Sequence, residues 1–225
     1  IADLHLPLGI DKPMDIFGKA WENYVERLAD NWQSVVKEND VVVLPGDFSW
    51  ATYLEQSVKD FEYLHKLNGK KILLKGNHDY WWSTAAKAKK FFAECGITSI
   101  EILYNNAFQY GEYSLCGTRG WFYEEEKGGE HDKKIMLREV GRLEASLKAA
   151  PTEKKLVFLH YPPIFQKYEC PEILRLLKEH EVRLCCYGHI HGKGCNAAFN
   201  GWRGGTEYKL VSADWVDFTP VKIIE

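Results

Sequence analysis

Hydrophobic and polar positions follow two alternating patterns along the first half of the chain. Apolar residues recur at helical spacing over 15–38 and 53–67, which predicts two amphipathic helices, and a third helix is predicted over 84–94. Between the helices lie two short apolar runs, 41–45 and 71–75, of the length typical of buried strands. Strands that alternate with helices predict an α/β protein with a partly parallel sheet.

The second half of the chain predicts more elements in a less regular order. Two short runs, 100–103 and 113–116, are bounded by turn residues and predict a hairpin. The other expected elements are helices over 135–147 and about 171–180, and strands over 156–159, 182–187, 207–211 and 221–224. Because we find no linker, repeat or low-complexity segment, residues 1–225 are interpreted as a single domain.

Five groups of polar residues are found along the chain, each where a hydrophobic run ends. They are Asp3-Leu4-His5, Gly46-Asp47, Gly76-Asn77-His78-Asp79, His160 and Gly188-His189-Ile190-His191. Five of the eight histidines belong to these groups, a pattern that predicts a metal site built from loops at strand ends. Each glycine precedes a candidate ligand, where a sharp turn favours a positive φ. Since only two residues precede Asp3, we expect that the first strand is truncated and that the natural chain starts several residues earlier.

The residue types in these groups indicate which chemistry the site supports. Imidazole combined with carboxylate suits zinc, iron or manganese, and no thiolate is needed. One carboxylate can bridge two cations, which together bind a phosphate and lower the pKa of a water molecule. In an extended segment His189 and His191 point to the same side, so both can face one site.

Taken in order, these groups resemble the motifs of the calcineurin-like metallophosphoesterases, and the likeness spans residues 3–191. The resemblance implies a bacterial-type phosphohydrolase whose fold is a four-layer sandwich of two mixed β-sheets flanked by helices. It also implies a metal site at the strand ends that holds two divalent or trivalent ions, manganese, iron or zinc. The implied ligands are Asp3, His5, Asp47 and His191 for the first ion, and Asp47, Asn77, His160 and His189 for the second.

The same resemblance implies the reaction, which is phosphodiester or phosphomonoester hydrolysis by attack of metal-bound hydroxide on phosphorus. His78 is then the general acid that protonates the leaving alkoxide, and Asp79 orients its ring. General acid catalysis agrees with this role, because a histidine partnered by a carboxylate donates a proton well near neutral pH.

One motif departs from the protein Ser/Thr phosphatase branch, where an arginine that binds phosphate follows the Gly-Asp pair. Here the chain reads Phe48-Ser49-Trp50-Ala51-Thr52 after Asp47, so that arginine is absent. This shifts the expectation from protein substrates to phosphodiesters or small phosphomonoesters. Arg119 has two interpretations, a phosphate contact from another loop or an ion pair at the surface.

Aromatic residues near the motifs leave two interpretations open in each case. Tyr80 and Trp81 form either a wall that contacts substrate or part of the core. Residues 121–123, followed by three glutamates at 124–126, form either a cap that shapes the substrate site or a solvated surface.

Composition restricts the remaining classes of function. The chain is 45% hydrophobic, which favours a packed domain, and its formal net charge of −3 argues against a nucleic-acid partner. Six cysteines without metal-binding spacing, and no membrane span or signal peptide, predict a cytoplasmic protein. We therefore expect a metal-dependent phosphoric ester hydrolase that acts on a small phosphorylated substrate. The alternatives are a catalytically silent scaffold of the same fold and a nuclease.

Overall fold

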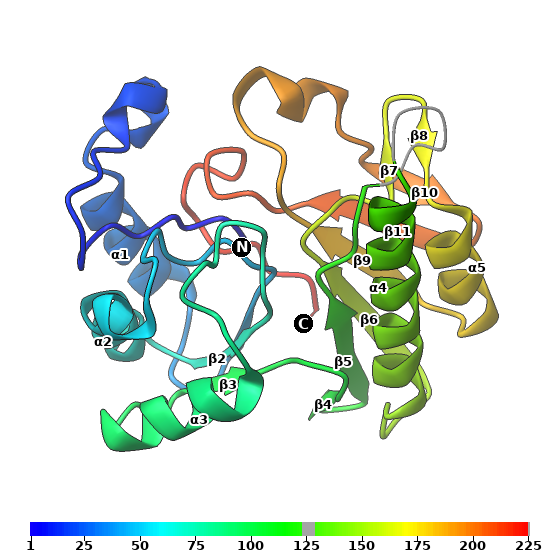
Figure 1. Cartoon of the computed structure of the whole chain (residues 1–225), viewed down its shortest axis with the longest axis horizontal. Coiled ribbons are helices and arrows are strands. Elements are labelled where there is room, and N and C mark those ends of the chain that lie inside the picture. The colour runs from blue at the N-terminus through cyan, green and yellow to red at the C-terminus, as the bar shows by residue number, and fades with distance from the viewer. Residues whose placement is uncertain (123–128, 225) are drawn as a thin grey trace. The chain divides into compact units, whose positions relative to one another are not determined.

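The computed structural model describes residues 1–122 and 129–224 and divides into two compact units (Figure 1). The first unit comprises Ile1–Ile102 and Val211–Glu225, and the second comprises Leu103–Leu210. The predicted acidic cap at 124–126 lies outside the described residues.

The first unit contains a parallel three-stranded sheet of order β1-β2-β3. Its strands are β1 (Val41–Leu44), β2 (Lys70–Leu73) and β3 (Ile100–Ile102). Its helices are α1 (Tyr24–Val35), α2 (Val58–Lys66) and α3 (Ala85–Glu94), with short 3-10 turns η1 (Asp15–Phe17), η2 (Lys19–Trp21) and η3 (Leu54–Ser57). Parallel pairing requires each strand to leave the sheet through a crossover, which places the loops after β1 and β2 at the same edge.

Apolar side chains from all three helices form the core of the first unit. Trp32 of α1, Phe61 of α2 and Phe92 of α3 are each at most 3% exposed and belong to one cluster. Thr84 caps α3 by accepting a hydrogen bond from the backbone of Lys87, as expected for a helix start. The helical spacing of apolar residues therefore explains how these helices pack.

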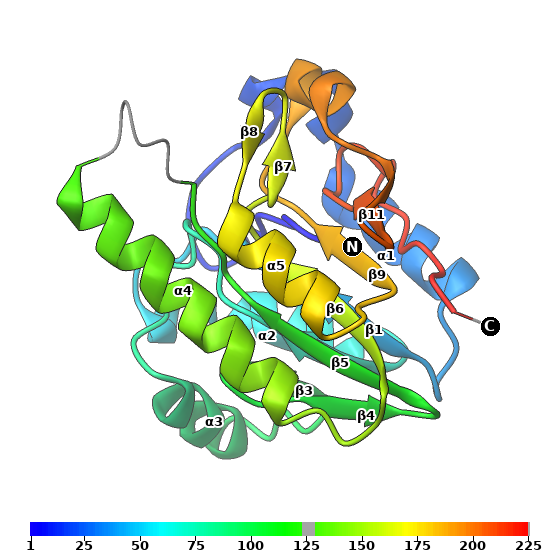
Figure 2. The ribbon, with the colours of Figure 1, turned by 90° about the vertical axis from the view of Figure 1, so that its right-hand side faces the viewer.

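The second unit contains a mixed six-stranded sheet of order β10-β11-β9-β6-β5-β4. Strands β5 (Tyr113–Thr118), β6 (Lys154–Leu159), β9 (Leu184–Tyr187) and β11 (Thr206–Leu210) run parallel, and β4 (Phe108–Tyr110) and β10 (Gly201–Arg203) add antiparallel edges. Helices α4 (Glu130–Lys148) and α5 (Pro171–Glu179) lie side by side on one face of this sheet (Figures 1 and 2). A small hairpin of β7 (Ile164–Phe165) and β8 (Tyr168–Glu169) precedes α5, and η4 (Gly192–Ala197) follows β9.

The structure confirms the α/β class and most predicted elements, and it corrects several. The run 100–103 does not form a hairpin with 113–116, because β3 pairs parallel with β2 and the hairpin partner of β5 is β4. Residues 221–224 form no strand. The six-stranded sheet is mixed as expected, whereas the three-stranded sheet is entirely parallel. Among the helices that the structure describes, none has the length and apolar character needed to cross a membrane.

Candidate metal centre

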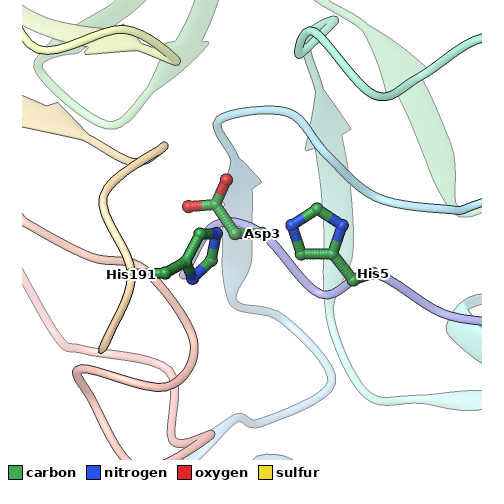
Figure 3. A group of neighbouring side chains, drawn as sticks. All are labelled: Asp3, His5 and His191. Atoms are coloured by element: carbon green, nitrogen blue, oxygen red, sulfur yellow. The ribbon is translucent and has the colours of Figure 1, made fainter. Parts of the chain in front are cut away.

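Asp3 and His5 lie on the N-terminal segment of the first unit, next to the loop that follows β1 (Figure 3). Both side chains are buried, and both residues have positive φ angles, 59° and 47°. The backbone N–H of Asp3 donates to Gly46 at 3.0 Å, and that of His5 donates to Asp47 at 3.0 Å. These hydrogen bonds hold the first two candidate ligands beside the third.

Asp47 itself is 1% exposed and has a φ of 50°. The strain of that angle in a non-glycine residue is typical of functional loops. Gly46 has a φ of 87°, as expected, but Gly76 and Gly188 do not have positive φ angles. Gly76 is needed for space instead, because a Cβ there would lie 2.1 Å from Oδ1 of Asp47.

The carboxylate of Asp79 binds the backbone of both ligand loops. Its Oδ2 accepts hydrogen bonds from Asp47 N at 2.9 Å and Gly76 N at 2.7 Å, and its Oδ1 accepts one from Phe48 N at 2.9 Å. The indole of Trp81 donates a further bond to Oδ1 at 3.0 Å. Asp79 thus fixes the backbone around Asp47, and its predicted role in orienting the ring of His78 stays a prediction.

The ring of His78 faces Asp47. Its Nδ1 lies 2.8 Å from Oδ2 of Asp47, and its backbone N–H donates to Oδ1 at 2.7 Å. The Asn77 amide nitrogen lies 3.0 Å from the same Nδ1. Because a carboxylate only accepts, we assign a ring hydrogen to Nδ1, which donates it to Asp47 and leaves Nε2 for proton transfer. The Asn77 amide nitrogen only donates, so with this assignment it contacts Nδ1 without a hydrogen bond. The side chain is 35% exposed, so it is accessible to a ligand.

The donors of the first unit suit a metal ion. One ligand atom each from His5, Asp47 and His78 lie within 4.8 Å of one another. Asp3 and Asp47 are at most 1% exposed, and a cation is one of the partners that stabilise buried carboxylates. Imidazole with carboxylate is a donor set for zinc, iron or manganese. The chemistry of these residues therefore fits the predicted metal.

Tyr80 and Trp81 have different environments. Tyr80 is 59% exposed, with its ring 6.0 Å from that of His78, so it is available to a substrate. Trp81 is 3% exposed and packs edge-on against Phe61 at 5.1 Å. The structure corrects the interpretation of Trp81 as a substrate wall, because its indole belongs to the core.

Two groups near these ligands were not predicted. Trp50 lies 4.6 Å from the ring of His5 and 4.7 Å from that of His78, measured between centroids. Asp60 of α2 is buried and accepts hydrogen bonds from Leu8 and Ser49. Trp50 lies in the segment after Asp47, where the protein Ser/Thr phosphatases have their phosphate-binding arginine. The absence of that arginine was the one signal in the sequence that pointed to this segment.

His160 and His189 lie together in the second unit, with ring centroids 5.0 Å apart. The Tyr161 ring contacts both, at 5.1 Å from His160 and 4.2 Å from His189. The backbone of Gly188 donates to His160 at 3.2 Å, which connects the ends of β6 and β9. His191, drawn in Figure 3, directly precedes η4. The structure thus places His160 and His189 side by side, as their positions at strand ends predicted.

Arg119 is engaged in an ion pair within the second unit. Its Nη2 lies 3.3 Å from Oε1 of Glu139, a side chain that is 1% exposed. Arg142 contacts the same oxygen at 2.6 Å, and the Thr118 hydroxyl donates to Oε2 at 2.6 Å. The guanidinium carbon also lies 4.7 Å from the ring of Trp121. Of the two interpretations, the ion pair describes Arg119, although the pair is largely buried rather than at the surface.

Comparison with known families shows to which family the chain belongs. The sequence profile of the calcineurin-like phosphoesterases matches residues 1–193. The chain belongs to this family. None of the curated protein sequences matches it significantly.

Solved structures show the same fold at low identity to this calcineurin-like phosphoesterase. A phosphopantetheinyl hydrolase from Mycobacterium tuberculosis is 14% identical, with 96% of this chain and 90% of that one covered and a TM-score of 0.58. TT1561 of Thermus thermophilus is 17% identical, with 81% and 80% covered and a TM-score of 0.51. AQ665 from Aquifex aeolicus, a protein of unknown function, is 16% identical, with 98% and 92% covered and a TM-score of 0.50.

Membership of the calcineurin-like phosphoesterases is shown by the profile, and the structural likenesses show the fold alone. The family typically binds a dinuclear metal centre, and the imidazole of His5 beside the carboxylate of Asp47 agrees with metal binding by this member.

Proposed function

We propose that this calcineurin-like phosphoesterase hydrolyses phosphodiester or phosphomonoester bonds of a small phosphorylated substrate. The observation that carries the proposal is the cluster of His5, Asp47 and His78, whose ligand atoms lie within 4.8 Å of one another. An inactive scaffold has no need of a strained, buried aspartate with an accessible histidine beside it.

The proposed metal ligands are the residues that match the family's motifs. They are Asp3, His5, Asp47 and Asn77 in the first unit, and His160, His189 and His191 in the second. Two bound cations, manganese, iron or zinc, would neutralise the phosphate charge and lower the pKa of the attacking water. Asp47 is the proposed bridging ligand, and its backbone is held for that purpose by the carboxylate of Asp79.

His78 is the proposed general acid. Its Nδ1 donates to Asp47, so the ring is oriented by one carboxylate while Nε2 stays available to the leaving oxygen. As an imidazolium, the ring carries a second hydrogen on Nε2. It transfers this proton to the leaving alkoxide oxygen, which departs as an alcohol while His78 becomes neutral, and the barrier falls for substrates with poor leaving groups. Asp79 supports this role indirectly, because it fixes the loops that carry Asp47 and His78.

Tyr80 is the proposed substrate contact, since its exposed ring lies next to His78. Arg119 already pairs with Glu139, and the first unit has no arginine after Asp47 to bind a phosphate. We therefore propose a small phosphoester rather than a phosphoprotein as the substrate. The buried thiols of Cys116, Cys185 and Cys186 suit a reducing compartment, and we propose the cytoplasm.

Hydrolysis of bis-p-nitrophenyl phosphate and p-nitrophenyl phosphate in the presence of Mn²⁺ tests the proposal. We expect turnover by the natural sequence and none by Asp47→Asn, which keeps the size of the side chain but removes its charge. Trp202→Ala, at a 63% exposed tryptophan of β10, is the control and should keep full activity. Turnover no higher than that of Asp47→Asn on every phosphoester tried would contradict the proposal.

A further inference from the structure

The indole of Trp50 contacts the rings of two histidines in the first unit. His5 stacks on it, with 4.6 Å between ring centroids and 25° between ring planes. His78 lies 4.7 Å from the same centroid at an angle of 50°. One side chain therefore touches a proposed metal ligand and the proposed general acid.

Trp50 is itself fixed by the N-terminal segment. Its Nε1 points to the sulfur of Met14 at 2.9 Å, and its backbone N–H donates to Leu6 at 3.1 Å. The ammonium of Lys12 lies 3.0 Å from the ring centroid, a cation–π contact. Contacts at the edge, the face and the backbone leave the indole little freedom to move.

The contacts of His78 explain why an aromatic ring beside it matters. Its polar contacts to Asp47 and Asn77 are all made by Nδ1 or by the backbone N–H, on one side of the residue. One hydrogen bond at one ring nitrogen leaves the ring able to tilt, and the side chain is 35% exposed. An aromatic wall beside the ring limits that tilt and keeps Nε2 aimed in one direction. A displacement of a catalytic group by about 1 Å can reduce the rate by about 100-fold.

We propose that Trp50 is a positioning residue, which holds the rings of His5 and His78 in their working orientations and is itself clamped by Lys12. The inference rests on the proposed function, in which His78 protonates the leaving group. It assigns a role to the segment where the phosphatase arginine is absent. The indole carries no charge for a phosphate, so it acts through the histidines rather than on the substrate.

The geometric part of the proposal is tested on metal-free protein, without any assay of activity. Ring currents of an indole shift the proton resonances of neighbouring rings, so NMR spectra of the histidine rings report whether Trp50 lies against them. His5→Asn and His78→Asn assign the two sets of resonances. We expect Trp50→Ala to move both sets and Lys12→Met to move them in the same direction by less. Trp202→Ala and Lys59→Met, which replace exposed residues elsewhere, should move neither.

The chemical part is tested by comparing two leaving groups. p-Nitrophenolate leaves without a proton, whereas the alkoxide of benzyl phosphate needs one. We expect Trp50→Ala to lower kcat for benzyl phosphate at least about 10-fold more than kcat for p-nitrophenyl phosphate, with little change in KM. Trp50→Phe should recover most of the loss, and Lys12→Met should show a selective loss of roughly 2- to 5-fold.

The outcomes separate the inference from the proposed function. Equal losses on the two substrates, or histidine resonances that do not move in Trp50→Ala, would overturn the positioning role. If Trp50→Ala does not fold, Trp50→Phe and Lys12→Met decide by the same two criteria. If the natural sequence turns over neither substrate, the proposed function is contradicted, and unmoved histidine resonances would then overturn the placement of Trp50 as well.

Discussion

Asp60 of α2 is a buried carboxyl that connects two loops of the first unit. Its Oδ1 accepts a hydrogen bond from the backbone of Leu8 at 2.8 Å, and its Oδ2 accepts one from the hydroxyl of Ser49. Burial raises the pKa of Asp60 from 3.8 to about 6, although the hydrogen bonds from Ser49 and Leu8 act in the opposite direction.

The raised pKa makes stability depend on pH with a defined sign. The folded protein holds the proton of Asp60 more tightly than the unfolded chain, so protonation of this group stabilises the fold. That contribution is complete below the unfolded pKa of 3.8 and is lost as the pH rises through the folded pKa of about 6. The shift corresponds to about 3 kcal/mol in total, and about 1 kcal/mol of it is lost between pH 5 and pH 7.

Asp60→Asn removes the titrating group and keeps its shape. We expect the free energy of unfolding of the natural sequence, minus that of Asp60→Asn, to fall by about 1 kcal/mol between pH 5 and pH 7. Urea unfolding of metal-free protein, followed by tryptophan fluorescence, measures both values. Asp15→Asn, at an exposed aspartate, is the control and should show no such change. A difference for Asp60→Asn that stays constant or rises with pH would refute the reasoning.

Three further substitutions test the packing of the first unit and the buried ion pair of the second. Gly76→Ala places a Cβ against Asp47, so we expect it to lower the free energy of unfolding by about 1–3 kcal/mol and to weaken Mn²⁺ binding. An unchanged Mn²⁺ titration would show that the loop has room for the methyl group. Trp81→Ala empties a core position and should cost about 3–5 kcal/mol in urea unfolding, whereas a loss below about 1 kcal/mol would contradict its placement in the core. Glu139→Gln leaves the guanidinium of Arg119 without its carboxylate and should lower the free energy of unfolding by about 3 kcal/mol. An unchanged thermal unfolding transition would show that the ion pair does not stabilise the fold.

Most of the correct predictions of helices and strands came from the helical spacing of apolar residues and from the polar motifs at strand ends. The apolar positions of α2 and α4 are spaced as a helix requires, and those residues are the ones that pack. The hairpin prediction failed because β3 pairs parallel with β2, and parallel pairing has no local signal in the sequence. The turn at Gly111 does close a hairpin, but its first strand is the short segment Phe108–Tyr110.

The sequence could indicate the candidate ligands, because chemistry restricts their residue types. It could not indicate which other side chains lie around them. Asp3, His5 and Asp47 adopt positive φ angles, which are uncommon outside glycine even though Asp and His tolerate them better than most residues. Trp50 contacts His5 across 45 positions of the chain, and Asp60 contacts Leu8 across 52. Such contacts depend on how the loops fold together, so no spacing in the sequence indicates them.

Metal content tests the central claim most directly, because the account makes Asp47 the ligand that two cations share. Protein purified without chelator, loaded with Mn²⁺ and freed of excess metal, should contain about two ions per chain by elemental analysis. The Asp47→Asn protein should retain fewer, and Trp202→Ala should match the natural sequence. A natural chain that retains no metal, or an Asp47→Asn chain that still holds the full complement, would contradict the account.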